Sequence, residues 1–312
     1  MKERINAHPG GKGTKALLAG ICATFIWGLA PAFIRTLSEE VGVLLSSGIT
    51  TTIGGLLLFV YKWKKTGLKA IYKVPLRYWI LCGSSYIGFT LSSNLSVGFS
   101  LNREQVLVTG LVRLLWPLMT LVMAIPINKA KASPLFLLSS LCCLLGVAIS
   151  NLGGSGLDFY GLMSNIGAAW LPLMLALVSS FCWGFYSNFL TKIIHDESLD
   201  FVSILMIVTG CIHLLLSIVL PQPAGFGFSI FVQFLFIVFV SNCLANIFWN
   251  MAMLSSQSLN VIVLANFLPV ISTLLTALIL GVRITVYLLA GSVLVVTGTI
   301  LSKQFIKQED SA

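Results

Sequence analysis

Apolar residues occur along this chain in long runs separated by short polar connections. Ten runs of about 18 to 24 residues are long enough for a helix to cross a hydrocarbon core of about 30 Å. We expect spans at residues 15–38, 42–61, 76–98, 104–126, 133–151, 169–191, 201–221, 229–252, 259–280 and 284–306. The pattern therefore predicts an all-α membrane protein of ten transmembrane helices, which leaves no room for a soluble domain.

The second part of the chain repeats motifs of the first part in the same order. Phe25–Gly28 reads FIWG and recurs as FCWG at Phe181–Gly184, while Pro117 and Pro269 lie 152 residues apart. Each match alone is weak, but several matches at nearly one offset indicate an internal duplication.

Two halves follow from this duplication, residues 1–155 and residues 156–312, and each half contains five of the expected helices. Because five is odd, the second half must enter the membrane in the opposite direction to the first. The sequence thus predicts two inverted five-helix repeats. This architecture recurs in secondary transporters, whose substrate sites lie near the midplane between the repeats.

Composition and charge support a membrane location and indicate an orientation. The chain is 57% hydrophobic and only 9% charged, with a mean hydropathy of +0.97. If the amino terminus is cytoplasmic, basic residues concentrate in the inner segments, and the outer segments hold only Arg35, Arg103 and Arg283. The positive-inside rule therefore predicts that both termini are cytoplasmic. Because the basic residues lie at span ends, we read the net charge of +9 as contact with a lipid bilayer and expect no nucleic-acid partner.

Arg113 is the residue that most needs an explanation. It lies ten residues after Arg103, roughly 15 Å at helical rise, which is about half of a hydrocarbon core. An arginine at that depth costs on the order of 2.5 to 3.5 kcal/mol, so a functional role is the default hypothesis. No Asp or Glu lies within the hydrocarbon part of any expected span. We therefore expect an anionic group of a substrate to supply the counter-charge, since a guanidinium matches a carboxylate geometrically.

Two structural roles for Arg113 compete with substrate binding. One is an ion pair, for which the sequence offers no acid at the right depth. The other is hydrogen bonding to backbone carbonyls that Pro117 leaves without a donor.

Polar and aromatic residues at helical spacing predict which helix faces line a substrate path. Asn242, Asn246, Trp249 and Asn250 form one such stripe, and a shift by 156 residues places another in the third span. The expected substrate-binding residues are Arg113, Trp116, Tyr86, Asn94, Trp27, Trp183, Tyr186, Asn246, Asn250 and Asn266, and the expected gating residues are Pro117 and Pro269. The alternative for each of them is hydrogen bonding or packing between helices, and Gly110, Gly146 and Gly298 are expected to allow close helix contacts.

Other chemistries find little support in the sequence. No arrangement of nucleophile, base or metal ligands is visible, so we expect neither an enzyme nor a metal or other cofactor. All seven cysteines fall inside expected helices, which argues against disulfides, and no Walker-type loop would couple transport to ATP. No intramembrane carboxylate is available for proton coupling; His213 is the one alternative near neutral pH. These features favour passive or weakly coupled movement of a solute.

Short motifs across the whole chain resemble the EamA family of the drug/metabolite transporter (DMT) superfamily, in particular its YddG-type aromatic amino acid exporters. They are Ile26–Gly28 with Ile34–Arg35, Leu115–Pro117, Trp183 with Tyr186, Trp249–Asn250, and Pro269. The resemblance implies a ten-helix basket around a central cavity, alternating access between the halves, and export across the bacterial inner membrane. Relatives tend to carry an amide and a tyrosine where this chain has Arg113 and Leu114, which favours a ligand with an exposed negative group.

The resulting hypothesis is a secondary transporter that exports amino acids, aromatic ones among them, or related small metabolites. Arg113 would hold the carboxylate and the aromatic side chains would stack on a ring. The alternatives are a carrier of another anionic or zwitterionic metabolite, an importer, and, as a different class, a channel. We expect a monomer or a weak homodimer.

Overall fold

The structure, a computed structural model, describes residues 12–150, 167–194, 199, 201–219, 223, 225, 227–253 and 267–307. These residues are almost entirely helical. Those up to residue 150 form α1 (Lys12–Val41), α2 (Val43–Thr66), η1 (Leu68–Lys73), η2 (Tyr78–Cys82), α3 (Gly83–Gly98), α4 (Arg103–Arg113), α5 (Trp116–Asn128), β1 (Lys131–Ala132) and α6 (Pro134–Ser150). The later ones form α8 (Trp170–Ile193), α9 (Val202–Val219), α10 (Phe228–Leu235), η5 (Phe236–Leu244), α11 (Ala245–Met253), α13 (Leu268–Leu280), α14 (Val286–Gln304) and β2 (Ile306–Lys307).

The helices coincide with the apolar runs of the sequence. Seven segments of the described chain are long and apolar enough to cross a membrane, and Pro134–Ser150 and Leu268–Leu280 are shorter apolar helices. The remaining run, near 76–98, is helical from Tyr78 to Gly98 but rich in serine. The first part of the run at 259–280 lies outside the described residues, as do the last residue of the run at 133–151 and the last two of the run at 201–221. The all-helical membrane architecture that the sequence predicts is therefore confirmed.

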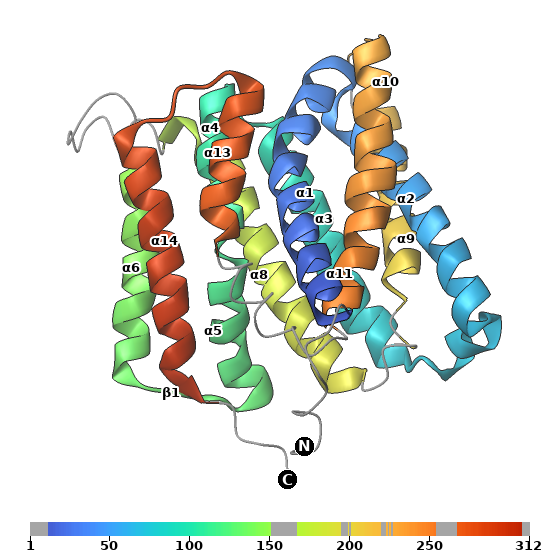
Figure 1. The fold of residues 1–312 in the computed structure, drawn as a ribbon, viewed down its shortest axis with the longest axis horizontal. Coiled ribbons are helices and arrows are strands. Elements are labelled where there is room, and N and C mark those ends of the chain that lie inside the picture. The colour runs from blue at the N-terminus through green and yellow to red at the C-terminus, as the bar shows by residue number, and fades with distance from the viewer. Residues whose placement is uncertain are drawn as a thin grey trace.

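The helices run between two ends of a single bundle (Figure 1). One end holds the last residues of α1 and α13 and the first residues of α4, and we call it the Glu39 end. The opposite end holds the last residues of α5, the β1–β2 pair and the start of α1, and we call it the Asn128 end. The most extensive helix contacts are α6 with α14, α2 with α9, α8 with both α3 and α5, and α1 with both α13 and α11.

The fourth apolar run is interrupted beside Arg113. Arg113 is the last residue of α4, and Pro117 lies in the first turn of α5. Between them the chain forms a tighter turn of the 3₁₀ type: Leu115 N–H donates to the carbonyl of Val112, three residues back, at 3.1 Å. A proline is tolerated in a first turn, where its missing N–H would have no helical partner.

A second helix begins in the same way. Pro269 lies in the first turn of α13, and both α5 and α13 contain 13 residues. Each ends at a residue with left-handed backbone, Lys129 (φ 54°) after α5 and Gly281 (φ 67°) after α13. The two proline-initiated helices thus match in length, start and termination.

Small residues let α6 and α14 approach closely. A Cβ atom on Gly146 would lie 2.7 Å from the carbonyl oxygen of Gly291, and one on Gly298 would lie 2.8 Å from that of Ser139. These glycines allow the expected close helix contact. The same expectation fails for Gly110, because a Cβ there would meet no atom of the described residues within 4 Å.

Gly146→Ala should therefore destabilise the protein, because the added methyl group meets backbone that cannot move aside easily. We expect a loss on the order of 1 to 3 kcal/mol, seen as a lower melting temperature in detergent. Gly110→Ala is the matched control and should leave the melting temperature unchanged or slightly raised, because alanine favours helix over glycine. Equal losses in both variants would contradict this account of the α6–α14 contact.

Candidate functional site

Arg113 lies at the break between α4 and α5 with its side chain partly exposed. Its Nη1 donates a hydrogen bond to Oγ of Ser93 on α3 at 3.0 Å. Within the described part of the chain, Arg113 forms no ion pair with any acid. The hydroxyl of Ser93 orients the guanidinium but does not neutralise it, so its charge is available to an anion.

The backbone carbonyl that Pro117 leaves without a donor belongs to Arg113 itself, four residues earlier. Ser180 on α8 is placed to satisfy this carbonyl, because its Oγ lies 2.9 Å from the carbonyl oxygens of both Arg113 and Val112. The hydroxyl has one hydrogen, which these two carbonyls share with that of Ala176 at 3.1 Å. The Arg113 side chain is not used for that purpose. The alternative in which Arg113 binds the carbonyl left without a donor by Pro117 is therefore not the arrangement observed.

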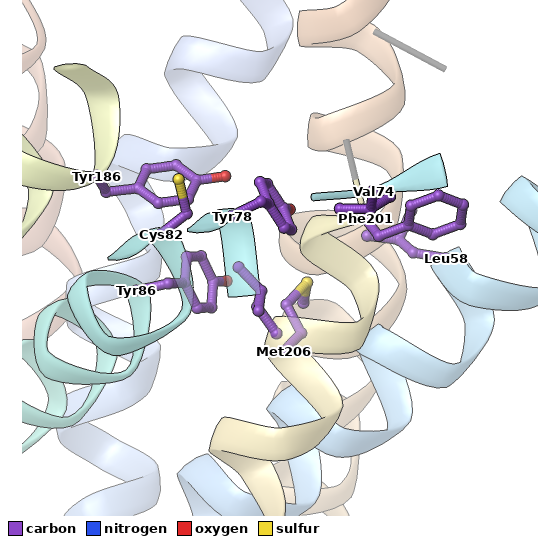
Figure 2. Close-up of a cluster of buried hydrophobic side chains, with 9 residues drawn as sticks. Leu58, Val74, Tyr78, Cys82, Tyr86, Tyr186, Phe201 and Met206 are labelled. Atoms are coloured by element: carbon purple, nitrogen blue, oxygen red, sulfur yellow. The ribbon is translucent and has the colours of Figure 1, made fainter. Parts of the chain in front are cut away.

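Four of the expected residues, all aromatic, form one group that begins at Trp116, three residues after Arg113. Trp183 on α8 has its ring centroid 5.9 Å from that of Trp116 and 5.3 Å from that of Tyr186, and the Tyr186 ring lies 5.5 Å from the Tyr86 ring. Figure 2 shows Tyr86 and Tyr186 near each other, at one side of a buried cluster that also contains Tyr78 and Met206. We call Tyr86, Phe89, Trp116, Trp183 and Tyr186 the aromatic cluster.

Phe89 belongs to this cluster but was not anticipated from the sequence. Its ring centroid lies 4.5 Å from that of Trp183. The signal was present, because Tyr86, Phe89 and Ser93 have the spacing i, i+3, i+7 and share one face of α3. The same face therefore carries two aromatic rings and the hydroxyl that holds Arg113. Asn94, also expected to bind a substrate, is the next residue along α3 and is buried.

A second group of expected residues lies on α1 and α11, apart from the aromatic cluster. The Trp27 and Trp249 ring centroids are 5.4 Å apart, and Trp27 Nε1 donates to the carbonyl of Ser241 at 3.2 Å. Asn246 Nδ2 donates to the carbonyl of Asn242, one turn back in its own helix, at 2.8 Å. Asn242 in turn donates to the carbonyl of Thr50 on α2 at 2.9 Å, so this part of the stripe connects helices.

Of the remaining expected residues, the structure describes some fully and others in part or not at all. Pro117 and Pro269 start α5 and α13, as described above. Asn250 lies in α11, although its side chain is outside what the structure describes, and Asn266 lies outside the described residues altogether. A cavity of about 10 Å³, enough for about one water, lies among α1, α4 and α13 and is lined by residues that include Pro31, Gly110, Leu114 and Thr276.

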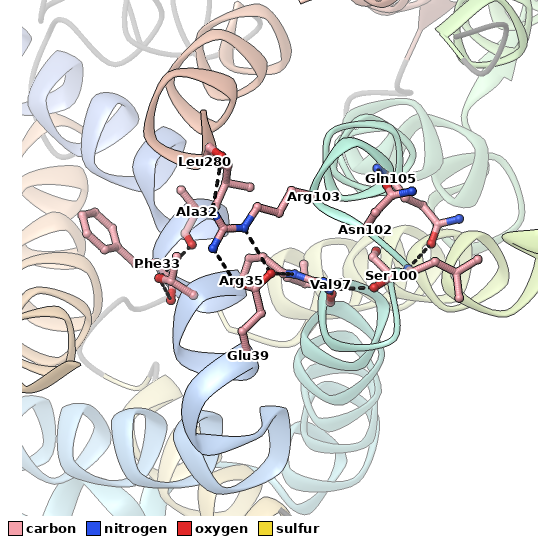
Figure 3. Close-up of polar contacts among 12 residues, drawn as sticks. Ala32, Phe33, Arg35, Glu39, Val97, Ser100, Asn102, Arg103, Gln105 and Leu280 are labelled. Carbon is pink, nitrogen blue, oxygen red and sulfur yellow. Dashed lines mark hydrogen bonds and ion pairs between the residues drawn. The ribbon is translucent and has the colours of Figure 1, made fainter. Parts of the chain in front are cut away.

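A charged network at the Glu39 end was also missed by the sequence analysis, which used its basic residues only for orientation. Figure 3 shows Glu39 between two arginines: Arg35 Nε lies 2.8 Å from Glu39 Oε1, and Arg103 Nη2 lies 2.7 Å from Glu39 Oε2. Arg35 is buried, and its Nη1 donates to the carbonyls of Val97 and Ser100. The i, i+4 spacing of Arg35 and Glu39 was the available signal.

Polar side chains also connect helices at the Asn128 end. Asn128 Nδ2 donates to Oδ1 of Asn188 on α8 at 2.6 Å, and Asn188 Nδ2 donates to the carbonyl of Thr120 at 2.9 Å. Lys192 Nζ donates to the carbonyl of Ile127 at 2.9 Å. These contacts hold α5 against α8.

The chemistry of the site is that of binding. The described residues contain no group of three or more His, Cys, Asp or Glu side chains that could hold a metal ion, and all seven cysteines are free thiols. Arg113, a guanidinium without a carboxylate partner among the described residues, lies three residues before Trp116 of the aromatic cluster. Such a pair of features can bind a molecule that carries an anionic group and an apolar ring.

Ser180→Ala should destabilise the α4–α5 break, because it removes the donor from the carbonyl of Arg113. We expect a loss of about 1 to 3 kcal/mol, measured by thermal or denaturant unfolding in detergent. Ser179→Ala is the control, since the neighbouring hydroxyl is equally buried and has no hydrogen-bond partner within the described structure. If both substitutions have the same effect, Ser180 does not support the break in the way proposed.

Comparisons with known proteins agree with the helical architecture. The chain is 28% identical over 287 residues to a protein of Salmonella typhimurium named aromatic amino acid exporter YddG, covering 92% of this chain and 96% of that protein. It is 25% identical over 288 residues to the Escherichia coli protein of the same name, with the same shares covered. A solved crystal structure with 19% sequence identity has the same fold, with a TM-score of 0.64 over 93% of this chain and 97% of that one.

A family model of membrane transporters matches nearly the whole chain, in two separate segments. The model is that of the EamA-like transporter family, and it matches residues 14–152 and residues 170–303. The chain therefore belongs to the EamA-like transporter family and is a membrane transporter, not an enzyme.

Proposed function

We propose that this protein is a secondary transporter that exports amino acids, with aromatic amino acids among its substrates, and that Arg113 binds the substrate carboxylate. One observation carries the proposal: Arg113, near the middle of the apolar segment Arg103–Asn128, contacts Ser93 and no acid within the described chain. Its charge in an apolar environment is costly unless an anion shares it. A bound carboxylate would supply that anion.

The aromatic cluster supports the second part of the substrate assignment. Trp116 follows Arg113 after the two-residue break, and Trp183, Tyr186, Phe89 and Tyr86 extend the aromatic surface from there. Rings of this kind stack on an aromatic side chain. The two curated relatives are named aromatic amino acid exporters, which agrees with this arrangement. Another anionic or zwitterionic metabolite with an apolar group is the alternative substrate, and import is the alternative direction.

We further propose that residues 1–155 and 156–312 form two inverted five-helix repeats and that the chain crosses the membrane ten times. The two separate matches to one family model support this, as do the equal lengths of α5 and α13. Helix contacts also recur at the repeat offset. Gly184 on α8 lies against Met119 and Thr120 on α5, and Gly28 on α1 lies against Ile271 and Ser272 on α13.

Alternating access follows from that arrangement. The expected substrate residues lie on both halves, and a substrate would be exposed on one side of the membrane at a time as the halves move. Pro117 and Pro269 act as matched gating positions, because each begins a helix that packs against the other half. In this proposal the membrane is the bacterial inner membrane, and the Asn128 end is cytoplasmic, with both termini, by the positive-inside rule.

Replacing Arg113 tests the carboxylate site. In proteoliposomes, Arg113→Gln should reduce uptake of the transported amino acid roughly 10- to 150-fold, which corresponds to one hydrogen-bonded charge contact of about 1.5 to 3 kcal/mol. Uptake of the corresponding amino acid amide, which lacks the carboxylate, should change far less. Arg113→Lys keeps the positive charge but lacks the paired N–H donors of the guanidinium. Its uptake of the amino acid should lie between that of the unmodified protein and that of Arg113→Gln. An equal loss for the acid and the amide would remove Arg113 from the carboxylate site.

A counterflow measurement separates the carrier from the channel. Liposomes preloaded with unlabelled amino acid should accumulate labelled amino acid faster than empty liposomes. The reason is that a carrier exchanges substrate, carrying unlabelled amino acid out each time it brings labelled amino acid in. The initial rate should also saturate with concentration. Rates that rise linearly without stimulation from the opposite side would support a channel.

A further inference from the structure

The carboxyl-terminal ends of α5 and α13 lie at opposite ends of the bundle, and each meets a cationic side chain. The last carbonyls of a helix have no N–H partner within the helix and carry the negative end of its dipole. A lysine or arginine placed there satisfies a carbonyl and the dipole together. In both helices the cation comes from another helix.

At the Glu39 end the cation is Arg103, and its partner is α13. Arg103 Nη1 donates to the carbonyl of Leu280, the last residue of α13, at 3.3 Å (Figure 3). Glu39 braces the guanidinium, accepting from Arg103 Nη2 at 2.7 Å and from Nε at 3.2 Å. Arg35 positions Glu39 and is itself fixed by the carbonyls at the end of α3. Arg103 is therefore held by α1 and α3 while it contacts α13.

At the Asn128 end the cation is Lys192, and its partner is α5. Lys192 lies in the last turn of α8, and its Nζ donates to the carbonyl of Ile127, in the last turn of α5. Asn188, one turn earlier on α8, contacts Asn128. Lys192 has no acid partner among the described residues, so this contact is less strongly braced than that of Arg103.

The two contacts are reciprocal between the halves of the chain. Arg103 belongs to residues 1–155 and contacts α13 of the second half, whereas Lys192 belongs to residues 156–312 and contacts α5 of the first half. Both partners are the matched helices that begin at Pro117 and Pro269. To open one end by moving its proline-initiated helix away from the other half, the cation at that end must leave its carbonyl.

We propose that Arg103 and Lys192 are positioning residues that each hold one end of the transporter closed, Arg103 by capping α13 and Lys192 by capping α5, and that one contact is released at a time. The proposal rests on the alternating-access function proposed above, and it adds the residues that set the balance between the two open forms. Removing one cap favours opening at its own end, so the two substitutions shift the balance in opposite directions. A purely structural role for both residues would not produce opposite signs.

Distance measurements between spin labels test this in the full-length protein without any substrate. Labels attached through a genetically encoded ketone amino acid leave the seven native cysteines in place. One pair replaces Glu40 and Ile284 at the Glu39 end, and the other replaces Lys129 and Thr191 at the Asn128 end; all four positions are exposed. Arg103→Gln should increase the long-distance fraction of the Glu40–Ile284 pair at least threefold and not that of the other pair. Lys192→Gln should do the reverse.

Matched controls remove one positive charge at each end without removing a cation from the end of α5 or α13. These are Arg283→Gln at the Glu39 end and Lys303→Gln at the Asn128 end, both at exposed positions, and neither should change the distance distributions. Arg103→Lys should restore most of the closed fraction. If Arg103→Gln does not fold, Glu39→Gln, which removes the brace, should shift the Glu40–Ile284 pair in the same direction.

Shifts of the same end by both substitutions, or unchanged distances in folded variants, would overturn the proposal. So would shifts of equal size in the charge controls. Because no substrate is needed, the result is independent of whether Arg113 binds a carboxylate. Opposite shifts in a protein that does not transport amino acids would uphold the two caps and reject only the substrate assignment.

Discussion

The break beside Arg113 depends on satisfying one backbone carbonyl inside an apolar environment. Pro117 removes the N–H that would have bonded to the carbonyl of Arg113, and an unsatisfied polar group in a membrane costs several kcal/mol. Ser180 supplies the missing donor from α8, at 2.9 Å. That contact joins α4 and α5 to α8 and brings Trp183 and Tyr186, on the same helix, to the side of Trp116. The location of the aromatic cluster therefore follows from the way in which the proline break is stabilised.

The same helix also connects the centre of the molecule to the Asn128 end. Ser180 contacts the end of α4. Farther toward the carboxyl-terminal end of α8, Asn188 and Lys192 contact α5. At the opposite end, Glu39 and its two arginines join α1, α3 and α4 to the end of α13. Polar contacts between helices thus occur at the central break and at both ends of the bundle.

Much of this could be predicted from one sequence, because hydrophobic length and proline position act locally. The apolar runs predicted the helix ranges, Pro117 indicated a backbone carbonyl without a donor, and the absence of an acid from the spans predicted an arginine without an ion pair. Contacts between distant segments were harder to predict. Ser180 was only one of several polar residues on its helix, and nothing local shows which carbonyl it meets. Phe89 and the Arg35–Glu39 pair have helical spacings that could have been read from the sequence, but Phe89 was overlooked and Arg35 was used only for orientation. Gly110 was misjudged, because a small residue permits a close contact but does not create one.

The central claim is that the guanidinium of Arg113 binds a carboxylate, and equilibrium binding to the unmodified protein tests it most directly. Isothermal titration calorimetry on purified protein would compare the amino acid that binds most tightly with its amide, which differs only in the charged group. The account predicts that the acid binds at least tenfold more tightly, the equivalent of about 1.4 kcal/mol. Equal affinities for the acid and the amide would contradict it.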